Sequence, residues 1–326
     1  MTGEKISGEK NSKFTRPLVL ISLGALCCFL WGSAFPAIKL GYSEFGIGSG
    51  DTATQILFAG IRFLLAGIMV VLFGSLKNKR PLVPRGKSEW GKTLTLSLFQ
   101  TMGQYVFFYI GLAHTSGVKA SILISLNVFF AVIISAVFFK AERLSALKIL
   151  GLVFGFLGVI VVNVSAGESV GGFQINGEGA IVLSAVAYAV SSVLIKKFSE
   201  KADPVMLSGN QFFVGGLLMV LCGVLAGGRL TTVTISGVLI LVYLALVSAV
   251  AYTLWGVLLK FNPVSRVAVM GFLNPVFGVL LSAVALGETA EAFSIKNALA
   301  LLLVALGIFA VNFKSQKPKS ENKTLK

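Results

Sequence analysis

Charged residues are scarce in this chain of 326 amino acids: Asp, Glu, Lys and Arg make up only 13% of it, against roughly 25% in soluble domains. There is a single histidine, and the acidic residues form no cluster. The sequence also lacks a phosphate-binding glycine motif and any cysteine or histidine spacing typical of a metal site. These absences argue against an enzyme, so we expect no catalytic residues, no metal and no cofactor.

The excess of positive charge does not indicate nucleic-acid binding. The net charge is +15, from 28 Lys and Arg against 13 Asp and Glu. The basic residues border apolar segments instead of forming one stripe, which is the arrangement expected beside anionic lipid headgroups. We therefore expect a lipid bilayer around the protein and no nucleic acid among its partners.

Apolar residues are what the sequence has in abundance, at 56% of the chain. They form ten runs, each close to the roughly 20 residues that a helix needs to cross the hydrocarbon layer. The runs cover residues 18–40, 53–76, 93–114, 118–139, 146–164, 179–195, 205–226, 238–259, 267–286 and 295–313. The sequence predicts an all-α integral membrane protein with ten transmembrane helices.

The distribution of basic residues predicts the orientation in the membrane. Most Lys and Arg residues lie in the two tails or in the alternate connections that share their side, whereas the opposite side has only Lys39, Lys119, Arg229 and Lys296. Because Lys and Arg are retained on the cytoplasmic side of short loops, both termini are expected in the cytoplasm. We expect a multi-pass protein of the plasma (inner) membrane.

The two halves of the chain repeat one another. Four residues of the first half recur 147 positions later with similar chemistry, so that Tyr105, Lys119, Asn127 and Ser135 correspond to Tyr252, Arg266, Asn274 and Ser282. At an offset of 149, Gly60, Phe63 and Gly67 correspond to Gly209, Phe212 and Gly216. Since each unit has an odd number of spans, the second must enter the membrane from the opposite face, which predicts two inverted five-helix repeats.

This duplication divides the chain into five parts. They are a cytoplasmic N-terminal tail (1–17), a first repeat (18–165), a connecting loop (166–177), a second repeat (178–313) and a basic cytoplasmic C-terminal tail (314–326). Internal repeats in an apolar chain are typical of secondary transporters, whose substrate site lies where the halves meet.

Three short motifs occur in a recognisable order: WGSAFPAIK at residues 31–39, Arg62-Phe63 in the second span, and Asn274-Pro275 followed by Gly287-Glu288 in the ninth. Together they resemble the EamA family of the drug/metabolite transporter superfamily, over about residues 18–313. The resemblance implies a ten-helix bundle with a central cavity, alternating access, and export or uptake of amino acids, other small metabolites or drug-like compounds. One departure is Asn127-Val128 in the first repeat, which predicts a proline-dependent helix break in one half only.

The candidate substrate cavity consists of polar and aromatic residues inside apolar spans, because polar groups within the bilayer face the bundle interior and often mark the substrate path. Several of them share a helical face by their three- and four-residue spacing. The candidates are Trp31, Ser33, Arg62, Gln104, Tyr105, Asn127, Tyr188, Ser191, Gln211, Tyr252, Trp255 and Asn274. For the serines, close packing between helices is the favoured alternative, and the aromatic residues could also anchor the protein at the membrane interface.

Arg62 is the most informative candidate, since it lies well inside the second span and its repeat partner is the neutral Gln211. Its planar donor group suits a carboxylate or phosphate, or could hold a gate closed through backbone carbonyls. The alternatives are an arginine that extends to the membrane interface or one that joins neighbouring helices. Both interpretations stay open at this point.

The sequence does not reveal how transport would be energised. No Asp or Glu lies deep in a span; Glu142 and Glu288 follow the fourth and ninth spans at near-equivalent places. The intramembrane carboxylate relay of proton-driven transporters is therefore not recognisable, and facilitated diffusion, exchange or proton coupling through a boundary glutamate all stay open. Capping or tethering of helix ends is the simpler role for these glutamates.

These observations predict a secondary transporter, independent of ATP, that moves a small organic metabolite by alternating access, with export as the favoured direction. Arg62 and the absence of buried carboxylates favour substrates with a carboxylate, such as amino acids. An uptake or exchange carrier and a lipid scramblase are the alternatives. The expected partners are a small-molecule substrate and the bilayer; the sequence leaves the oligomeric state open and is compatible with a monomer.

Overall fold

The structure, a computed structural model, describes residues 14–137, 145–163, 173–262, 267 and 269–313. All regular secondary structure in these residues is helical. Six helices are long and apolar enough to cross a membrane, namely Pro17–Glu44, Thr52–Asn78, Gly117–Ile134, Ile175–Ser199, Pro204–Leu225 and Ile235–Leu258, and three shorter apolar helices cover Ala146–Val161, Leu273–Leu286 and Ile295–Ala310. The expected all-α membrane class is confirmed.

The helices of the first half follow the predicted apolar runs. They are α2 (Pro17–Glu44), α3 (Thr52–Asn78), the continuous run of α4 (Gly86–Leu96), the π-helical segment η1 (Ser97–Gly103) and α5 (Gln104–His114), then α6 (Gly117–Leu123), α7 (Leu126–Val137) and α8 (Ala146–Asn163). The third run begins well before its apolar part, because Glu89 accepts a hydrogen bond from the backbone N–H of Arg85 and caps a polar first turn.

The second half repeats this order. It consists of a short π-helical turn, η2 (Ile175–Gly179), followed by α9 (Ala180–Ser199), α10 (Pro204–Leu225), α11 (Ile235–Phe261), the 3-10 segment η3 (Val269–Phe272) with α13 (Leu273–Leu286), the short α14 (Thr289–Ala292) and α15 (Ile295–Phe313). Helices α3 and α10 begin alike, because the side chains of Asp51 and Asp203 accept hydrogen bonds from the free backbone N–H groups of Thr54 and Val205.

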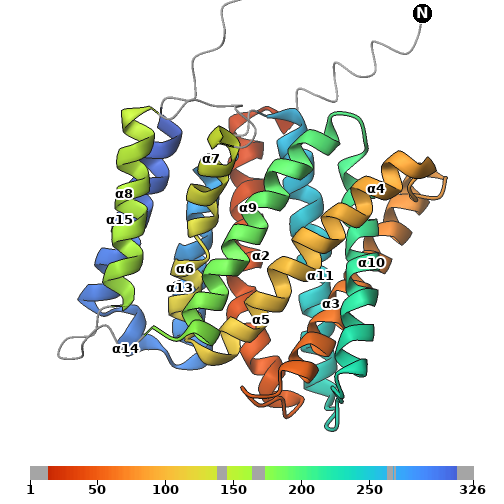
Figure 1. Ribbon diagram of the computed structural model, residues 1–326, viewed down its shortest axis with the longest axis horizontal. Helices are drawn as coiled ribbons and strands as arrows, with labels where there is room; N and C mark the ends of the chain where they lie inside the picture. The colour runs from red at the N-terminus through yellow and green to blue at the C-terminus, as the bar shows by residue number, and fades with distance from the viewer. Residues whose placement is uncertain (1–13, 138–144, 164–172, 263–266, 268, 314–326) are drawn as a thin grey trace, which may run out of the picture.

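Corresponding helices of the two halves run in opposite directions. In Figure 1, α2 descends and α9 ascends, α3 ascends beside a descending α10, and α8 descends beside an ascending α15. The start of α2 and the end of α15 therefore lie at the same end of the bundle, the upper end in this view.

Small residues let the paired helices approach closely. At Gly67 of α3 an added Cβ would collide with the backbone N of Phe213 in α10, and at Gly216 of α10 it would collide with the backbone N of Leu64. The α8–α15 pair follows the same rule, since a Cβ on Gly158 would lie 2.8 Å from Ala300 O. Close backbone contact of this kind is how helices associate within lipid.

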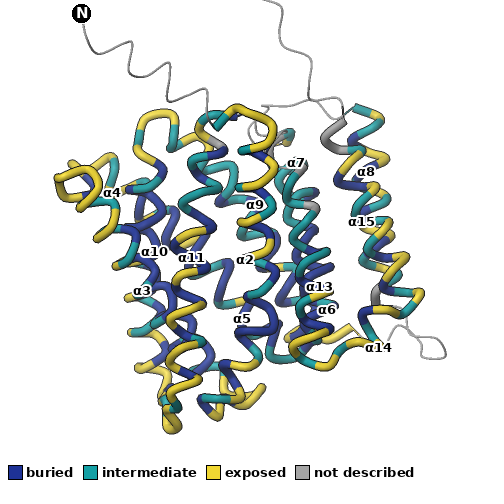
Figure 2. Tube along the Cα trace, turned by 180° about the vertical axis from the view of Figure 1, so that it is seen from behind, coloured by how far each residue is buried: buried dark blue, intermediate teal, exposed yellow. Residues whose placement is uncertain are grey.

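Large apolar side chains cover the outside of the bundle as well as its centre. Figure 2 shows exposed positions along the outer faces of α3, α8, α10 and α15, and these include Phe73, Leu225 and Phe309, with exposed fractions of 66%, 86% and 58%. An outer surface of this kind is unfavourable in water and fits the hydrocarbon layer.

The break in the ninth span has a counterpart in the fourth, although the proline itself occurs in one half only. Pro275 lies in the first turn of α13, directly after η3, where proline is tolerated. In the first half, α6 ends at Leu123 and α7 begins at Leu126 although no proline is present. There the Ser125 hydroxyl donates to Ser121 O at 3.2 Å, and serine bonds of this type bend helices.

Candidate functional site

Four aromatic residues from three helices meet in the middle of the bundle. The hydroxyl groups of Tyr105 in α5 and Tyr252 in α11 form a hydrogen bond. The ring of Trp31 in α2 lies 5.2 Å from the Tyr252 ring and 5.0 Å from the Trp255 ring, both edge to face. The three helices are thus joined by edge-to-face ring contacts and a hydroxyl pair, which leaves polar groups in an otherwise apolar centre.

Two buried polar atoms beside this aromatic cluster have no hydrogen-bond partner among the described residues: Trp31 Nε1 and Gln104 Oε1. The amide nitrogen of Gln104 reaches the Tyr252 hydroxyl at 3.5 Å. Buried polar groups without partners cost free energy, so they are rare in folded proteins and call for an explanation. Here one donor and one acceptor are left without partners beside the aromatic rings.

Arg62 is fully buried next to the same cluster, with only 1% of its side chain exposed. Its Nε donates to the backbone O of Leu244 and to the Ser248 hydroxyl, both at 3.1 Å, and its Nη1 donates to the Tyr109 hydroxyl at 2.9 Å. The guanidinium carbon also lies 5.9 Å from the centre of the Tyr105 ring. Arg62 thus joins α3 to α5 and α11, and it does not extend to the membrane interface.

Gln211, the repeat partner of Arg62, sits in a corresponding polar cluster. Its side-chain nitrogen donates to Gln100 Oε1, and its backbone O accepts from the hydroxyls of Ser97 and Thr101 at 3.1 and 3.3 Å. Ser97, Gln100 and Thr101 belong to the π-helical segment η1. Gln211 is therefore occupied in packing α10 against η1.

The remaining candidates divide between the core and the outside. Ser191 is buried, but its hydroxyl donates to Tyr188 O within its own helix, while Tyr188 packs against the main core. Ser33 lies towards the outside, since its hydroxyl bonds to Leu30 O and to Tyr243, a residue that is 38% exposed. Ser33 is thereby separated from the aromatic cluster.

The two asparagines lie in the first turns after the helix breaks. Asn127 belongs to the start of α7 and Asn274 to the start of α13. The side-chain oxygen of Asn274 is buried and has no hydrogen-bond partner in the described part of the chain. Equivalent breaks thus carry equivalent amides, one of which has an unused acceptor.

Of the two glutamates that follow the fourth and ninth spans, Glu142 lies outside the described residues. Glu288 accepts hydrogen bonds from the backbone N–H groups of Gly117 and Val118, at 3.1 and 3.0 Å. These are free donors of the first turn of α6, so Glu288 caps that helix and links the ninth span to the fourth.

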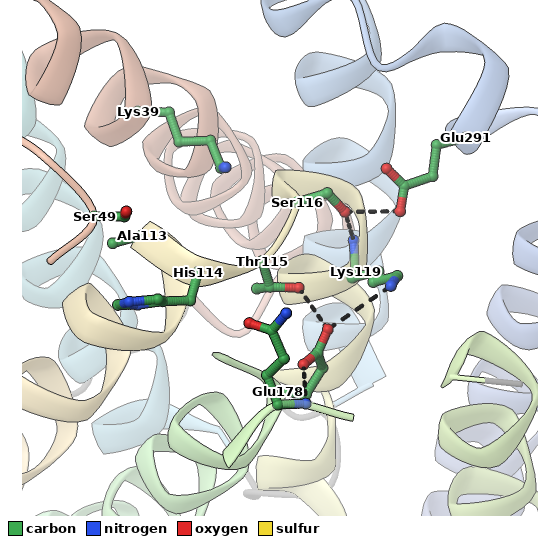
Figure 3. Close-up of a pocket in the computed structure, with 10 residues that line it drawn as sticks. Lys39, Ser49, Ala113, His114, Thr115, Ser116, Lys119, Glu178 and Glu291 are labelled. Atoms are coloured by element: carbon green, nitrogen blue, oxygen red, sulfur yellow. Dashed lines mark hydrogen bonds and ion pairs between the residues drawn. The ribbon is translucent and has the colours of Figure 1, made fainter. Parts of the chain in front are cut away.

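A polar pocket of about 530 Å³ opens at the end of the bundle where α2 and α5 finish, the lower end in Figure 1. Figure 3 shows the side chains that line it, which include Lys39, His114, Thr115, Ser116, Lys119, Glu178 and Glu291. Lys119 Nζ lies 3.7 Å from Glu178 Oε1, and the Thr115 hydroxyl donates to the same oxygen at 3.0 Å.

Sequence reasoning missed Tyr109 and the pocket. Tyr109 holds Arg62, and its position four residues after Tyr105 on the same helical face was an available signal. The pocket residues come from five separate places in the chain, and most of them border spans, so only their three-dimensional arrangement brings them together.

Comparison with known proteins gives one family and several relatives. The model of the EamA-like transporter family matches residues 18–164 and again residues 175–313. A Salmonella typhimurium protein named "Probable amino-acid metabolite efflux pump" is 28% identical over 307 residues, which cover 90% of this chain and 96% of that protein. The uncharacterized transporter YvbV of Bacillus subtilis is 27% identical, with 94% of each chain covered.

A chloroplastic WAT1-related protein of Arabidopsis thaliana is 27% identical over 294 residues, which cover 87% of this chain and 67% of that protein. Among solved structures, one crystal structure superposes with a TM-score of 0.63 at 23% identity and covers 89% of this chain and 96% of the other. That likeness shows a shared fold.

Proposed function

The chain belongs to the EamA-like transporter family, within the drug/metabolite transporter superfamily, and on that premise we propose that it carries a small organic metabolite between its two halves by alternating access. It is a multi-pass membrane protein. The proposal treats it as a secondary transporter and not as an enzyme, as the names of its relatives suggest. Export is the proposed direction, because two bacterial relatives are named as efflux pumps.

The proposed architecture has ten spans in two inverted repeats. The α4–η1–α5 run, together with the six long and three shorter apolar helices, supplies ten segments among the described residues. The opposite directions of corresponding helices support an inverted arrangement (Figure 1).

Reciprocal contacts between repeat-equivalent residues also support this arrangement. Gly67 faces Phe213 while Gly216 faces Leu64, and both pairs of equivalents are 149 positions apart. Phe63 stacks on its own equivalent, Phe212, with the ring centres 5.4 Å apart. A twofold axis between the halves produces such an exchange. If a residue of the first half contacts a residue of the second, the equivalents of these two residues must also contact each other.

The central aromatic cluster is the proposed substrate site, and the unpaired Trp31 Nε1 and Gln104 Oε1 are the observation that carries the proposal. A substrate between the rings would satisfy this donor and acceptor and would interrupt the Tyr105–Tyr252 hydrogen bond. That bond joins equivalent positions of the two halves, so a rocking movement of one half against the other would break it.

Arg62 contributes a positive charge beside this site. Its hydrogen-bond partners are two hydroxyl groups and a backbone carbonyl, all neutral, so the charge itself is not balanced by a carboxylate contact among the described residues. A substrate carboxylate near the Tyr105 ring would supply the missing negative charge. We therefore favour amino acids or related carboxylates as substrates.

The proposed location is the plasma (inner) membrane with both termini in the cytoplasm, which places the polar pocket outside the cell. We also propose that the chain is divided as its sequence predicts, into two terminal tails and two repeats joined by a connecting loop. A monomer contains both halves and so provides the whole central site.

Untargeted metabolite profiling of medium and cell extract tests this function. Cells would express the parent, Trp31→Ala, the matched variant Trp90→Ala, or no transporter; Trp90 is a suitable control because it is 42% exposed on α4. A compound enriched in the medium with the parent and Trp90→Ala, but not with Trp31→Ala, is the expected result. If none of the four cultures differs in any compound, constitutive export is wrong, and lipid scrambling and uptake in vesicles become the next assays.

A further inference from the structure

The polar pocket at the end of the bundle contains a positive charge that no described residue neutralises directly. Lys39, near the end of α2, lines the pocket; among the described residues Glu288 and Glu291 attract it from a distance, and none forms a hydrogen bond or a close ion pair with it. The second lysine of the pocket, Lys119, is already paired with Glu178 at 3.7 Å. Lys39 is thus the cation available to a ligand.

The pocket also contains a carboxylate that is only partly used. Glu291 Oε1 accepts a hydrogen bond from the Ser116 hydroxyl at 2.8 Å, while its other oxygen has no partner in the described ranges. The carboxylate of Glu178 is fully occupied by contrast, because it accepts from Thr115 and from the backbone N–H of Gln174 in addition to its ion pair.

The lining therefore presents one free positive and one partly free negative group in a single cavity. Figure 3 shows Lys39 reaching in from α2, with Glu291 contributed from the far side, beyond Ser116. A simple anion would be attracted by Lys39 but repelled by Glu291. A simple cation would be attracted by Glu291 but repelled by Lys39. A ligand with both charges satisfies both groups.

We propose that this pocket is a binding site for the zwitterion of a free α-amino acid, with the ligand carboxylate on Lys39 and the ligand ammonium group on Glu291. The inference rests on the proposed function, because it names the substrate class and the place where substrate is held before or after it passes the central site. The open, polar pocket contacts the common part of the amino acid, and selection of the side chain is left to the aromatic cluster.

Binding of three related probes to the purified full-length protein in detergent tests this site. The probes are L-alanine, L-alaninamide, which lacks the carboxylate, and N-acetyl-L-alanine, which lacks the ammonium group; saturation-transfer difference NMR measures their affinities. Each derivative is expected to bind about tenfold more weakly than alanine, as the loss of one charge-assisted hydrogen bond implies. Equal affinities for the three probes would overturn the proposal, and this comparison requires no variant.

Variants then locate the binding. Lys39→Gln is expected to lower the affinity for alanine to that for alaninamide, and Glu291→Gln to that for N-acetyl-alanine. Lys296→Gln is the matched control, because Lys296 lies at the same end of the bundle but does not line the pocket. An unchanged affinity for alanine in Lys39→Gln, with the same thermal unfolding as the parent, would assign the binding elsewhere.

Binding in the pocket and transport across the membrane can be tested separately. If alanine binding depends on Lys39 but no metabolite crosses vesicles that contain the protein, the pocket stands and the transport proposal fails. If metabolites cross the vesicles and the three probes bind equally, transport stands and the zwitterion site is wrong. Trp90→Ala is expected to retain the Lys39-dependent binding, since Trp90 is exposed on α4 and does not line this pocket.

Discussion

Arg62 has a full positive charge in the apolar interior, and the described residues that hold it are neutral hydrogen-bond acceptors. Removal of the guanidinium would leave the Leu244 carbonyl and the Tyr109 hydroxyl without this donor. A buried polar group left unpaired costs about 1–3 kcal/mol. We expect Arg62→Gln to unfold at a lower temperature than the parent and to transport more slowly, as measured by thermal unfolding in detergent and by flux in vesicles.

Arg62→Lys provides the control for charge. Lysine keeps the positive charge but lacks the planar donor group, so it cannot reach Leu244, Ser248 and Tyr109 together. We expect it to be less stable than the parent as well. If Arg62→Gln is as stable and as active as the parent, the residue neither joins the helices nor attracts the substrate.

The Tyr105–Tyr252 hydroxyl pair leads to a second prediction at the residue scale. Tyr252→Phe keeps the ring against Trp31 and Phe212 but removes this hydrogen bond and the longer contact from Gln104 Nε2. A hydrogen bond contributes about 0.5–1.5 kcal/mol, so the rate of transport should change by roughly twofold to tenfold while the fold is kept. Tyr243→Phe, which removes a hydroxyl contact on the outside of the bundle, should have a rate close to that of the parent. If Tyr252→Phe transports at the same rate as Tyr243→Phe and the parent, the Tyr105–Tyr252 hydrogen bond has no role in the movement of the two halves.

At the scale of helices, the close approach of α3 and α10 depends on glycine. A side chain at Gly216 would collide with the backbone of Leu64, which cannot move aside as a flexible side chain can. Overpacking of this kind costs about 1–3 kcal/mol or more, so Gly216→Leu should separate the helices and lower the unfolding temperature. Gly91→Ala in α4 is the control, because a Cβ there meets nothing within 4 Å and alanine favours the helix. If both variants unfold like the parent, this contact does not hold the halves together.

The helices themselves were readable from the sequence, because length and hydrophobicity decide which segments cross a bilayer. The predicted run 295–313 coincides with α15, and run 53–76 differs from α3 by two residues or fewer at each end. The π-helical segment η1 was not predicted, since it arises from contacts of Ser97 and Thr101 with Gln211 of a helix more than 100 residues away. The break at Ser125 was not predicted either, because serine gives only a weak signal of a helix break, whereas proline gives a strong one.

The structure brings some of the residues named from the sequence together and separates others. Tyr105 and Tyr252 were named from their spacing and Trp31 as an aromatic residue of the first motif, and the structure brings the three together because a shared helical face points inward. Ser33 was also named but lies towards the outside, since a single serine in an apolar span does not indicate which way it faces. The charged pocket could not be predicted, because no periodicity links Lys39 to Glu291.

At the scale of the whole molecule, the orientation in the membrane is open to a direct test. In a Cys222→Ser background, chosen because Cys222 is exposed while Cys27 and Cys28 are buried, single cysteines would replace Ser49 at the pocket end and Lys201 between α9 and α10. A membrane-impermeant thiol reagent should label Ser49→Cys in intact cells, and Lys201→Cys only after permeabilisation. The reverse pattern would invert the proposed orientation, and labelling of both from outside would rule out the proposed topology.

The central claim is that a metabolite passes through the aromatic site between two halves that move against each other. The most direct measurement is the flux of the compound identified by profiling, radiolabelled, into vesicles that contain the purified parent or Trp31→Ala. A carrier should give flux that saturates with concentration and accelerates when unlabelled compound is present on the opposite side, and Trp31→Ala should lose most of it. Flux that rises linearly with concentration, ignores compound on the opposite side and is equal in the two proteins would contradict the account and indicate an open pore.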